Sequence, residues 1–241
     1  MLNATVTGEG NDHKLLLAHG LFGSGRNLGI IAKRLSDAFE VTSVDMRNHG
    51  SSPWFDTHTY FDMADDLADF ADGDVMGHSM GGKAAMVLAL RHPEKVRRLI
   101  VADIAPVGYQ HTQMHLVEAM KALDTDQPSR SAARDALDVP EDVKDFLIQS
   151  FDVKNKRWLL NLDVLGAEMD KIVGFPDVSG TFEGPTLFLS GGDSDYVKRE
   201  HRDRIKSLFP NAKFAKIPGS GHWIHAEKPR EFEAAIRTFC S

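Results

Sequence analysis

The chain has 241 residues, of which 42% are hydrophobic and 26% charged. About half of the residues are apolar or glycine, the ordinary value for a globular protein, which excludes a disordered or collagen-like chain. The formal net charge is −7, so we expect no general basic surface for nucleic acid or for an anionic membrane. The length suits one α/β or β domain with room for an inserted subdomain.

Cysteine content and the N-terminal residues bear on the compartment. Cys240 is the one cysteine, so neither an intrachain disulfide nor a cysteine-based zinc site is expected. Residues 1–7 lack a basic region followed by an apolar one, and no apolar run reaches the roughly 18 residues of a membrane helix. We therefore expect a soluble cytoplasmic protein, either a monomer or a homodimer.

Short apolar runs alternate with helical spacing along most of the chain. Strands are expected at Lys14–Ala18, Glu40–Asp45, Asp74–Met76, Arg98–Ala102, Pro185–Ser190 and Lys213–Ile217. Helices are expected at Asn27–Phe39, Tyr60–Ala71, Gly81–Arg91, Lys198–Leu208 and Arg230–Phe239. Strands with little polar alternation, each followed by a helix, predict a mostly parallel sheet with helices on both faces, an α/β fold.

The segment from Ala105 to Gly180 breaks this alternation. It shows helical spacing at His115–Leu123, Ser129–Leu137, Glu141–Phe151 and Leu160–Ile172, and no strand is expected in it. We interpret it as a helical cap, about residues 105–180, inserted into a single domain whose core comprises residues 1–104 and 181–241.

The segment GHSMG, residues 77–81, has the form G-x-S-x-G. A short apolar strand precedes it and a helix-forming stretch follows it, which is the context of a nucleophile elbow. In so sharp a turn, side chains at the two glycine positions would clash, and the Ser79 hydroxyl is exposed at the C-terminal edge of the sheet. Ser79 is therefore the candidate nucleophile. A mere glycine-rich turn would leave the serine at its apex unexplained.

The segment HGLFG, residues 19–23, follows the first long strand. In this architecture the backbone N–H after His-Gly and that of the residue after the nucleophile face the substrate carbonyl oxygen. The candidate oxyanion-hole donors are therefore Leu21 and Met80. His19 is interpreted as a structural residue that braces this loop.

The segment Gly221–Trp223 follows the last strand, and its histidine can reach the edge of the sheet. A serine that precedes the histidine in the chain is the order of α/β-hydrolases, so His222 is the candidate general base. His225 forms an H-x-x-H pattern with His222. Because no carboxylate or cysteine completes a ligand set, we expect no metal.

The segments HGLFGS, VDMRNHGSS, GHSMGGKAAM, VADIAP and GSGHWIHAEKP together resemble the α/β-hydrolase superfamily. Within it they are most similar to small serine esterases of the YbfF type and their ABHD11-related group. The resemblance extends from Leu15 to Phe239 and implies an α/β-hydrolase fold with a Ser-His-Asp triad.

Two aspartates compete for the acid of that triad. Most α/β-hydrolases place it in a G-x-x-D loop after the cap, which corresponds to Asp195. The resemblance to the YbfF-like group implies an aspartate at the end of the preceding strand, which is Asp103. Asp103 follows an apolar run, where a cationic partner such as protonated His222 would explain a buried carboxylate. Asp103 is preferred, with Asp195 as the alternative acid.

Two further patterns bear on cofactor and substrate binding. Three glycines, at positions 23, 25 and 29, with Asp45 downstream resemble a dinucleotide fingerprint, but the third glycine is one place too late and no nucleotide cofactor is expected. Asp45 and Arg47 are interpreted as bracing the loop that ends in GSS. Phe22 and Trp223 flank the inferred site and are expected to line a substrate pocket.

These patterns predict a serine carboxylesterase that hydrolyses small, short-acyl esters through an acyl-enzyme on Ser79, with no cofactor. Acyl-CoA thioester hydrolysis, C–C bond hydrolysis and perhydrolysis are alternatives, since neither fold nor triad fixes the substrate. A catalytically dead binding module is the non-enzymatic alternative. The retained Ser79 and His222 argue against it.

Overall fold

A seven-stranded sheet forms the centre of the computed structural model, which describes residues 1–241. Every neighbouring pair of strands is parallel except β1, which is antiparallel to β3. The predicted fold class, an α/β-hydrolase fold with a mostly parallel sheet, is confirmed. In spatial order the strands are β1 (Ala4–Thr7), β3 (Glu40–Val44), β2 (Lys14–Ala18), β4 (Gly73–His78), β5 (Val96–Ala102), β8 (Thr186–Gly191) and β9 (Ala212–Ile217).

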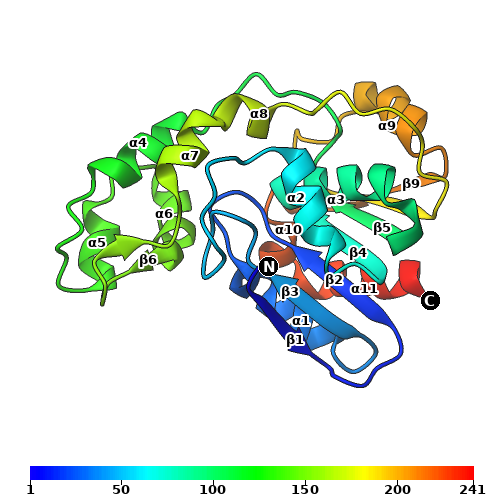
Figure 1. The fold of residues 1–241 in the computed structure, drawn as a ribbon, viewed down its shortest axis with the longest axis horizontal. Helices are drawn as coiled ribbons and strands as arrows, with labels where there is room; N and C mark the ends of the chain where they lie inside the picture. Colours follow the sequence, from blue (N-terminus) through cyan, green and yellow to red (C-terminus); the bar gives the residue numbers. More distant parts are fainter.

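Helices cover both faces of the sheet (Figure 1). One face carries α2 (Tyr60–Ala68), α3 (Met80–Arg91) and α9 (Arg202–Leu208), and a cluster of 47 buried hydrophobic residues extends from this side of the sheet into residues 105–180. The other carries α1 (Gly29–Leu35) and α11 (Pro229–Cys240) over a cluster of 18. The short α10 (Ile224–Glu227) precedes α11. None of the helices is both long enough and apolar enough to traverse a membrane.

The two longest helices are built for different degrees of burial. Every residue of α3 from Met80 to Ala89 is buried, as expected for a helix that is apolar on nearly all sides. In α11, Phe232, Ile236 and Cys240 recur every four residues and are buried, while the opposite side faces solvent. The helix that follows the serine is therefore fixed by packing on all sides.

Some element boundaries differ from those expected. The edge strand β1 escapes prediction because Ala4, Thr5 and Val6 are exposed, so its sequence carries no apolar run. The first expected helix is a 3-10 turn (Gly25–Leu28) followed by α1, which already ends at Leu35. The helix expected from Lys198 likewise begins with a 3-10 turn, Arg199–His201, before α9.

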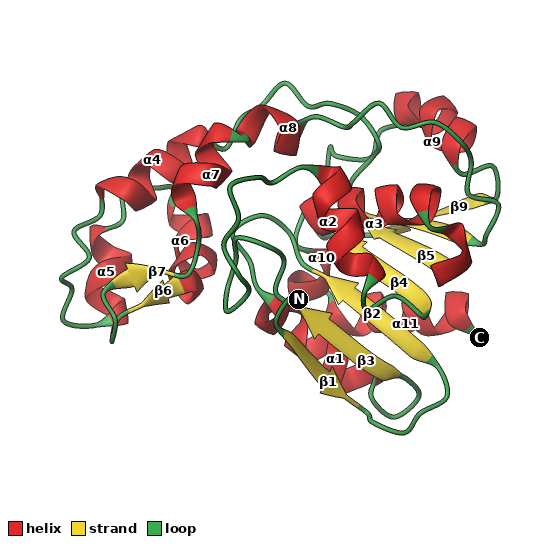
Figure 2. Cartoon of the chain, in the orientation of Figure 1, coloured by secondary structure: helices red, strands yellow, loops and turns green.

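Between β5 and β8 the chain leaves the sheet and forms what we call the inserted segment, residues 105–180. Figure 2 shows it beside the sheet, beyond the ends to which the arrows of β2 and β3 point. Its helices are α4 (Met114–Ala122), α5 (Arg130–Ala136), α6 (Glu141–Leu147), α7 (Leu162–Ala167) and α8 (Met169–Val173). The two long helices expected at 141–151 and 160–172 are thus shorter or split, because α6 passes into a 3-10 turn and α7 and α8 are separated at Glu168.

The expectation that this segment contains no strand is wrong. Two-residue strands β6 (Phe151–Asp152) and β7 (Arg157–Trp158) pair in an antiparallel hairpin. The buried rings of Phe151 and Trp158 stand opposite each other with centroids 5.1 Å apart, and Lys156 takes a positive φ of 52° in the turn. So short a hairpin depends on this aromatic pair, which periodicity does not reveal.

Candidate active site

Ser79 lies between the end of β4 and the start of α3. Its backbone has φ 53° and ψ −119°, a conformation strained for a non-glycine residue. A Cβ at Gly77 would collide with the carbonyl of Gly81, and one at Gly81 would collide with the carbonyl of Ala18. The two glycines of the motif are therefore required by the close approach of backbones, as the sequence predicts.

His222 lies in the loop between β9 and α10. Its Nε2 is 3.0 Å from the Ser79 hydroxyl oxygen. The loop is held by the Gly221 N–H, which donates to the Glu227 carboxylate (2.8 Å), and by the buried His78 ring, whose Nε2 is 2.9 Å from the His222 carbonyl oxygen. The ring of Tyr196 stacks on His222 with centroids 4.0 Å apart. These contacts direct the imidazole towards Ser79.

Asp103 follows β5 and is completely buried. Its Oδ2 is 2.8 Å from Nδ1 of His222. The Gly191 N–H donates to Oδ1 (3.0 Å), and the Ser194 hydroxyl donates to Oδ2. The φ of Asp103 is 51°, so the chain turns sharply after the strand and directs the carboxylate along the sheet edge. The structure thus brings Ser79, His222 and Asp103 together in one hydrogen-bonded series.

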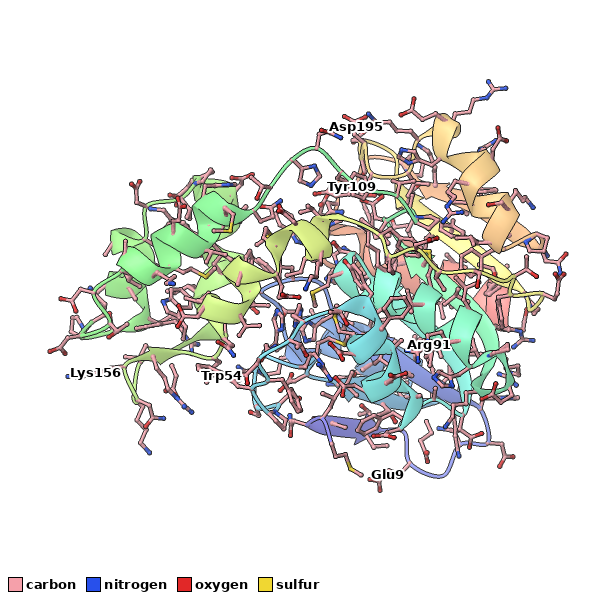
Figure 3. The ribbon with its side chains drawn as sticks, turned by 45° about the horizontal axis from the view of Figure 1, so that its top comes forward. Glu9, Trp54, Arg91, Tyr109, Lys156 and Asp195 are labelled. Atoms are coloured by element: carbon pink, nitrogen blue, oxygen red, sulfur yellow. The ribbon has the colours of Figure 1, made fainter.

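Asp195, the alternative acid, is exposed and makes no side-chain hydrogen bond or ion pair. Figure 3 labels it at the periphery of the molecule. Its neighbour Ser194 instead contacts Asp103. The sequence analysis does not predict a role for Ser194, although Ser194 stands in the G-x-x-D loop, residues 192–195, that offers Asp195.

The loop of residues 19–23 lies against the serine. The Leu21 N–H makes no hydrogen bond within the protein, and the Met80 N–H is the first of α3, where helical amides lack a partner. Phe22, in contrast, is fixed at φ 64° because its N–H donates to Nε2 of His49 (3.1 Å) and its carbonyl accepts from the Ser150 hydroxyl (2.8 Å). Two hydrogen bonds of Phe22 therefore hold the loop directly after the free Leu21 amide.

Buried histidines support this loop and its neighbours. Nε2 of His19 accepts from the Met46 N–H (2.9 Å), and Nδ1 of His49 donates to the Arg47 carbonyl (2.8 Å). Burial lowers the pKa of His19, His49 and His78, lowers that of His58 to about 3 and lowers that of His225 to about 4. These rings are neutral. All except that of His225 serve as fixed donors or acceptors, whereas Nδ1 of His225 is buried without a hydrogen-bond partner.

The loop of residues 45–52 is braced as expected. Asp45 accepts from the Gly25 N–H (2.8 Å) and the Ser51 N–H (2.8 Å), so it occupies the place of a structural acceptor. Arg47 makes a two-pronged contact with Asp66, at 2.6 and 3.0 Å. His225 packs edge-to-face against His78, with ring centroids 4.5 Å apart.

A cavity of about 230 Å³ opens beside Ser79. Phe22 and Trp223, the two residues expected to line a substrate pocket, both line this cavity. Its walls come from the core and from the inserted segment, which contributes Leu116, Val143, Phe146, Ile172 and Val173. No aspartate or glutamate lines the cavity. Lys83 is its one lysine or arginine.

The chain matches the Alpha/beta hydrolase family over residues 15–235. It belongs to that family. The alpha/beta hydrolase relatives include "Esterase YbfF" of Escherichia coli, 38% identical over 98% of this chain and 96% of the relative. They also include "sn-1-specific diacylglycerol lipase ABHD11" of Danio rerio, 40% identical over 96% of this chain and 80% of the relative. The solved structure "Marine microorganism esterase" is similar with a TM-score of 0.92 and 36% identity, over 99% of this chain and 98% of that one.

Proposed function

We propose that the protein is a serine carboxylesterase that works through an acyl-enzyme on Ser79. Relatives named as esterase and lipase support ester hydrolysis in general. The observation that carries the proposal is the series from the Ser79 hydroxyl to His222 (3.0 Å) and from His222 to Asp103 (2.8 Å). Such a series is the arrangement in which a serine hydroxyl is activated as a nucleophile.

In the first half-reaction, Ser79 Oγ bonds to the ester carbonyl carbon while Nε2 of His222 takes the hydroxyl proton. Asp103 accepts from Nδ1–H, holds this tautomer and stabilises the imidazolium. The tetrahedral intermediate then collapses, the bond to the alcohol oxygen breaks, and His222 returns the proton to that oxygen. The products of this half are the alcohol and an acyl-serine.

In the second half-reaction, His222 takes a proton from water, whose oxygen bonds to the acyl carbon. The second tetrahedral intermediate then collapses, the bond between the acyl carbon and Ser79 Oγ breaks, and His222 returns its proton to Oγ, which releases the carboxylic acid and restores the Ser79 hydroxyl. In both halves the negative oxygen receives hydrogen bonds from the N–H groups of Leu21 and Met80. Two donors fixed before the charge forms stabilise it by several kcal/mol.

The proposed substrates are small esters with short acyl chains. A cavity of about 230 Å³ is below the usual range of about 300–1,000 Å³ for ligand pockets. Residues of α4, α6 and α8 line it, so we propose that the inserted segment acts as a cap over the site. A cavity of this size favours acetate and butyrate over long acyl chains.

An activity-based probe tests the proposal. A fluorophosphonate should label the wild-type protein and leave Ser79→Ala unlabelled, whereas a binding module would not be labelled at all. A panel of 4-nitrophenyl esters run beside acyl-CoAs then separates carboxylesterase from thioesterase activity. Absence of labelling, or a tenfold preference for long acyl chains over acetate and butyrate, would contradict the proposal.

A further inference from the structure

A lysine lies inside the helix that follows the serine. Lys83 is one helical turn after Ser79, and its backbone N–H donates to the Ser79 carbonyl (3.0 Å). Its side chain is 1% exposed and forms no ion pair with a carboxylate. Burying an ammonium without a counter-charge is unfavourable. The burial of Lys83 therefore requires a specific explanation.

The ammonium group of Lys83 lies at the C-terminus of α8 in the inserted segment. Nζ donates to the Val173 carbonyl (2.9 Å) and to the Gly174 carbonyl. The hydroxyl of Tyr60 on α2 donates to the preceding carbonyl, that of Ile172 (2.6 Å). Three consecutive carbonyls at the negative end of α8 thus receive hydrogen bonds from two helices of the core.

Aromatic rings complete the surroundings of the ammonium. Nζ lies 4.8 Å from the ring centroid of Tyr109 and 5.8 Å from that of Tyr60, within the range of cation–π attraction. The Tyr109 N–H also donates to the Val173 carbonyl (3.1 Å). Burial lowers the pKa of Lys83 to about 7. Carbonyl groups and aromatic rings of the protein therefore surround the ammonium group, so its burial does not require an anionic substrate as a partner.

The helix α8 is too short to be stable without contacts to the rest of the protein. α8 has five residues, and an isolated helix of that length is not stable in water. Its last two residues, Ile172 and Val173, line the cavity beside Ser79. The position of this cavity wall is therefore set by whatever fixes the end of α8.

We infer that Lys83 is a positioning residue that fixes α8 as a wall of the cavity and thereby limits the size of the ester substituent admitted beside Ser79. The ammonium does not take part in bond making. It links the helix that carries the serine to the inserted segment. The part of this inference that concerns ester size rests on the proposed function, whereas the fixing of α8 does not.

The test compares Lys83→Met with Lys206→Met. Methionine keeps the length and bulk of the lysine stem and removes its donors. Lys206 is the matched control because its Nζ also donates to two carbonyls, those of Pro210 and Ala212, at a helix end that does not line the cavity. Tyr60→Phe, which removes one hydrogen bond to α8, serves as a second variant if Lys83→Met does not fold.

Two measurements are made on each variant. The first is amide hydrogen exchange over residues 169–174, which requires no substrate. The second is kcat/KM for two series of 4-nitrophenyl or alkyl esters, one lengthened on the acyl side and one on the alcohol side. In Lys83→Met we expect exchange at least tenfold faster in this segment, and a shift of at least fivefold towards longer chains in one series. Tyr60→Phe should shift both in the same direction by less, and Lys206→Met should shift neither.

The inference would be overturned if hydrogen exchange in residues 169–174 were unchanged in Lys83→Met. It would also be overturned if exchange became faster but kcat fell by the same factor for every ester chain length. If Lys83→Met does not fold, unchanged exchange in Tyr60→Phe would overturn it. If the wild-type protein hydrolyses no ester, the proposed function fails, while the exchange measurement still decides whether Lys83 holds α8.

Discussion

The core and the inserted segment reach the same cavity by different means. In the core, Leu21, Ser79, Asp103 and His222 each stand in a loop just after a strand: β2, β4, β5 and β9 respectively. The inserted segment contributes helix side chains, and it joins the core through apolar packing and through separate hydrogen bonds, among them those of Lys83 and Tyr60 to the end of α8. The ends of the strands thus position the proposed reacting groups, and contacts between the core and the inserted segment position the walls around them.

Substitution of the core residues that face the reacting atoms should have the largest effect. His222→Ala should lower kcat by more than a thousandfold, because no other base lies within hydrogen-bonding distance of Ser79 Oγ. The double variant Ser79→Ala/His222→Ala should be hardly worse than either single variant, since the two act as a unit. Steady-state kinetics on one activated acetate ester checks both. A His222→Ala enzyme with more than a few per cent of activity would refute the assignment.

Asp103→Asn should lower kcat by about 10²–10⁴ with the fold retained. The Gly191 N–H holds Oδ1, so the amide oxygen of the asparagine should take that place and its NH₂ group should face Nδ1 of His222. The ring would then carry its proton on Nε2, where it cannot accept the proton of Ser79. Asp195→Asn is the matched control and should lower kcat less than twofold. The reverse ranking would transfer the role of the acid to Asp195.

Acidification should destabilise the core, where the buried histidines lie. Burial lowers the pKa of His58 to about 3 and of His225 to about 4. Between these values and the ordinary 6.5 of an unfolded histidine, the unfolded state binds more protons. The free energy of unfolding should therefore fall by about 1.4 kcal/mol per pH unit for each such ring as pH decreases below 6.5.

Denaturant unfolding at pH 7.5, 6.5 and 5.5 measures that slope. His58→Gln and His225→Gln should each reduce it by the contribution of one proton. A wild-type free energy of unfolding that stays level or rises on acidification would show that these rings are not kept neutral by the fold.

The smallest effect is expected where the inserted segment touches the core loop. Ser150→Ala removes the hydroxyl that donates to the Phe22 carbonyl, so the Leu21 N–H should lose some of its orientation. We expect kcat to fall about three- to tenfold with KM nearly unchanged. Ser129→Ala is the control, because that hydroxyl contacts its own helix only. Equal kcat in the two variants would show that the inserted segment does not support this loop.

The core could be predicted from the sequence to a larger extent than the inserted segment. The sheet, the elbow at Ser79 and the loop of His222 carry apolar runs and glycines with a steric reason, so their places could be predicted. The choice between Asp103 and Asp195 could not be settled by pattern, because it depends on a positive φ at Asp103 and on which way the later loop folds.

The inserted segment was harder still. Its hairpin pairs Phe151 with Trp158, and the end of α8 is held by Lys83. The sequence does contain a signal for the role of Lys83, because this lysine lies in a helix whose other residues are nearly all apolar. A charged residue in such a place indicates a partner that only the folded chain supplies.

The order of the strands itself determines where the two amides proposed to hold the oxyanion lie. From β2 the chain proceeds to α1 on one face and then to β3, whereas from β4 it proceeds to α3 on the opposite face and then to β5. The loops after β2 and β4 therefore diverge, and parallel α/β sheets form a crevice at such a topological switch point. A Cβ on Gly20 would lie 3.2 Å from that of Ser79, so the two diverging loops start in contact. Any chain with the same strand order and helix placement would form this crevice. This chain adds two backbone N–H groups at its opening, those of Leu21 and Met80, that make no hydrogen bond within the protein.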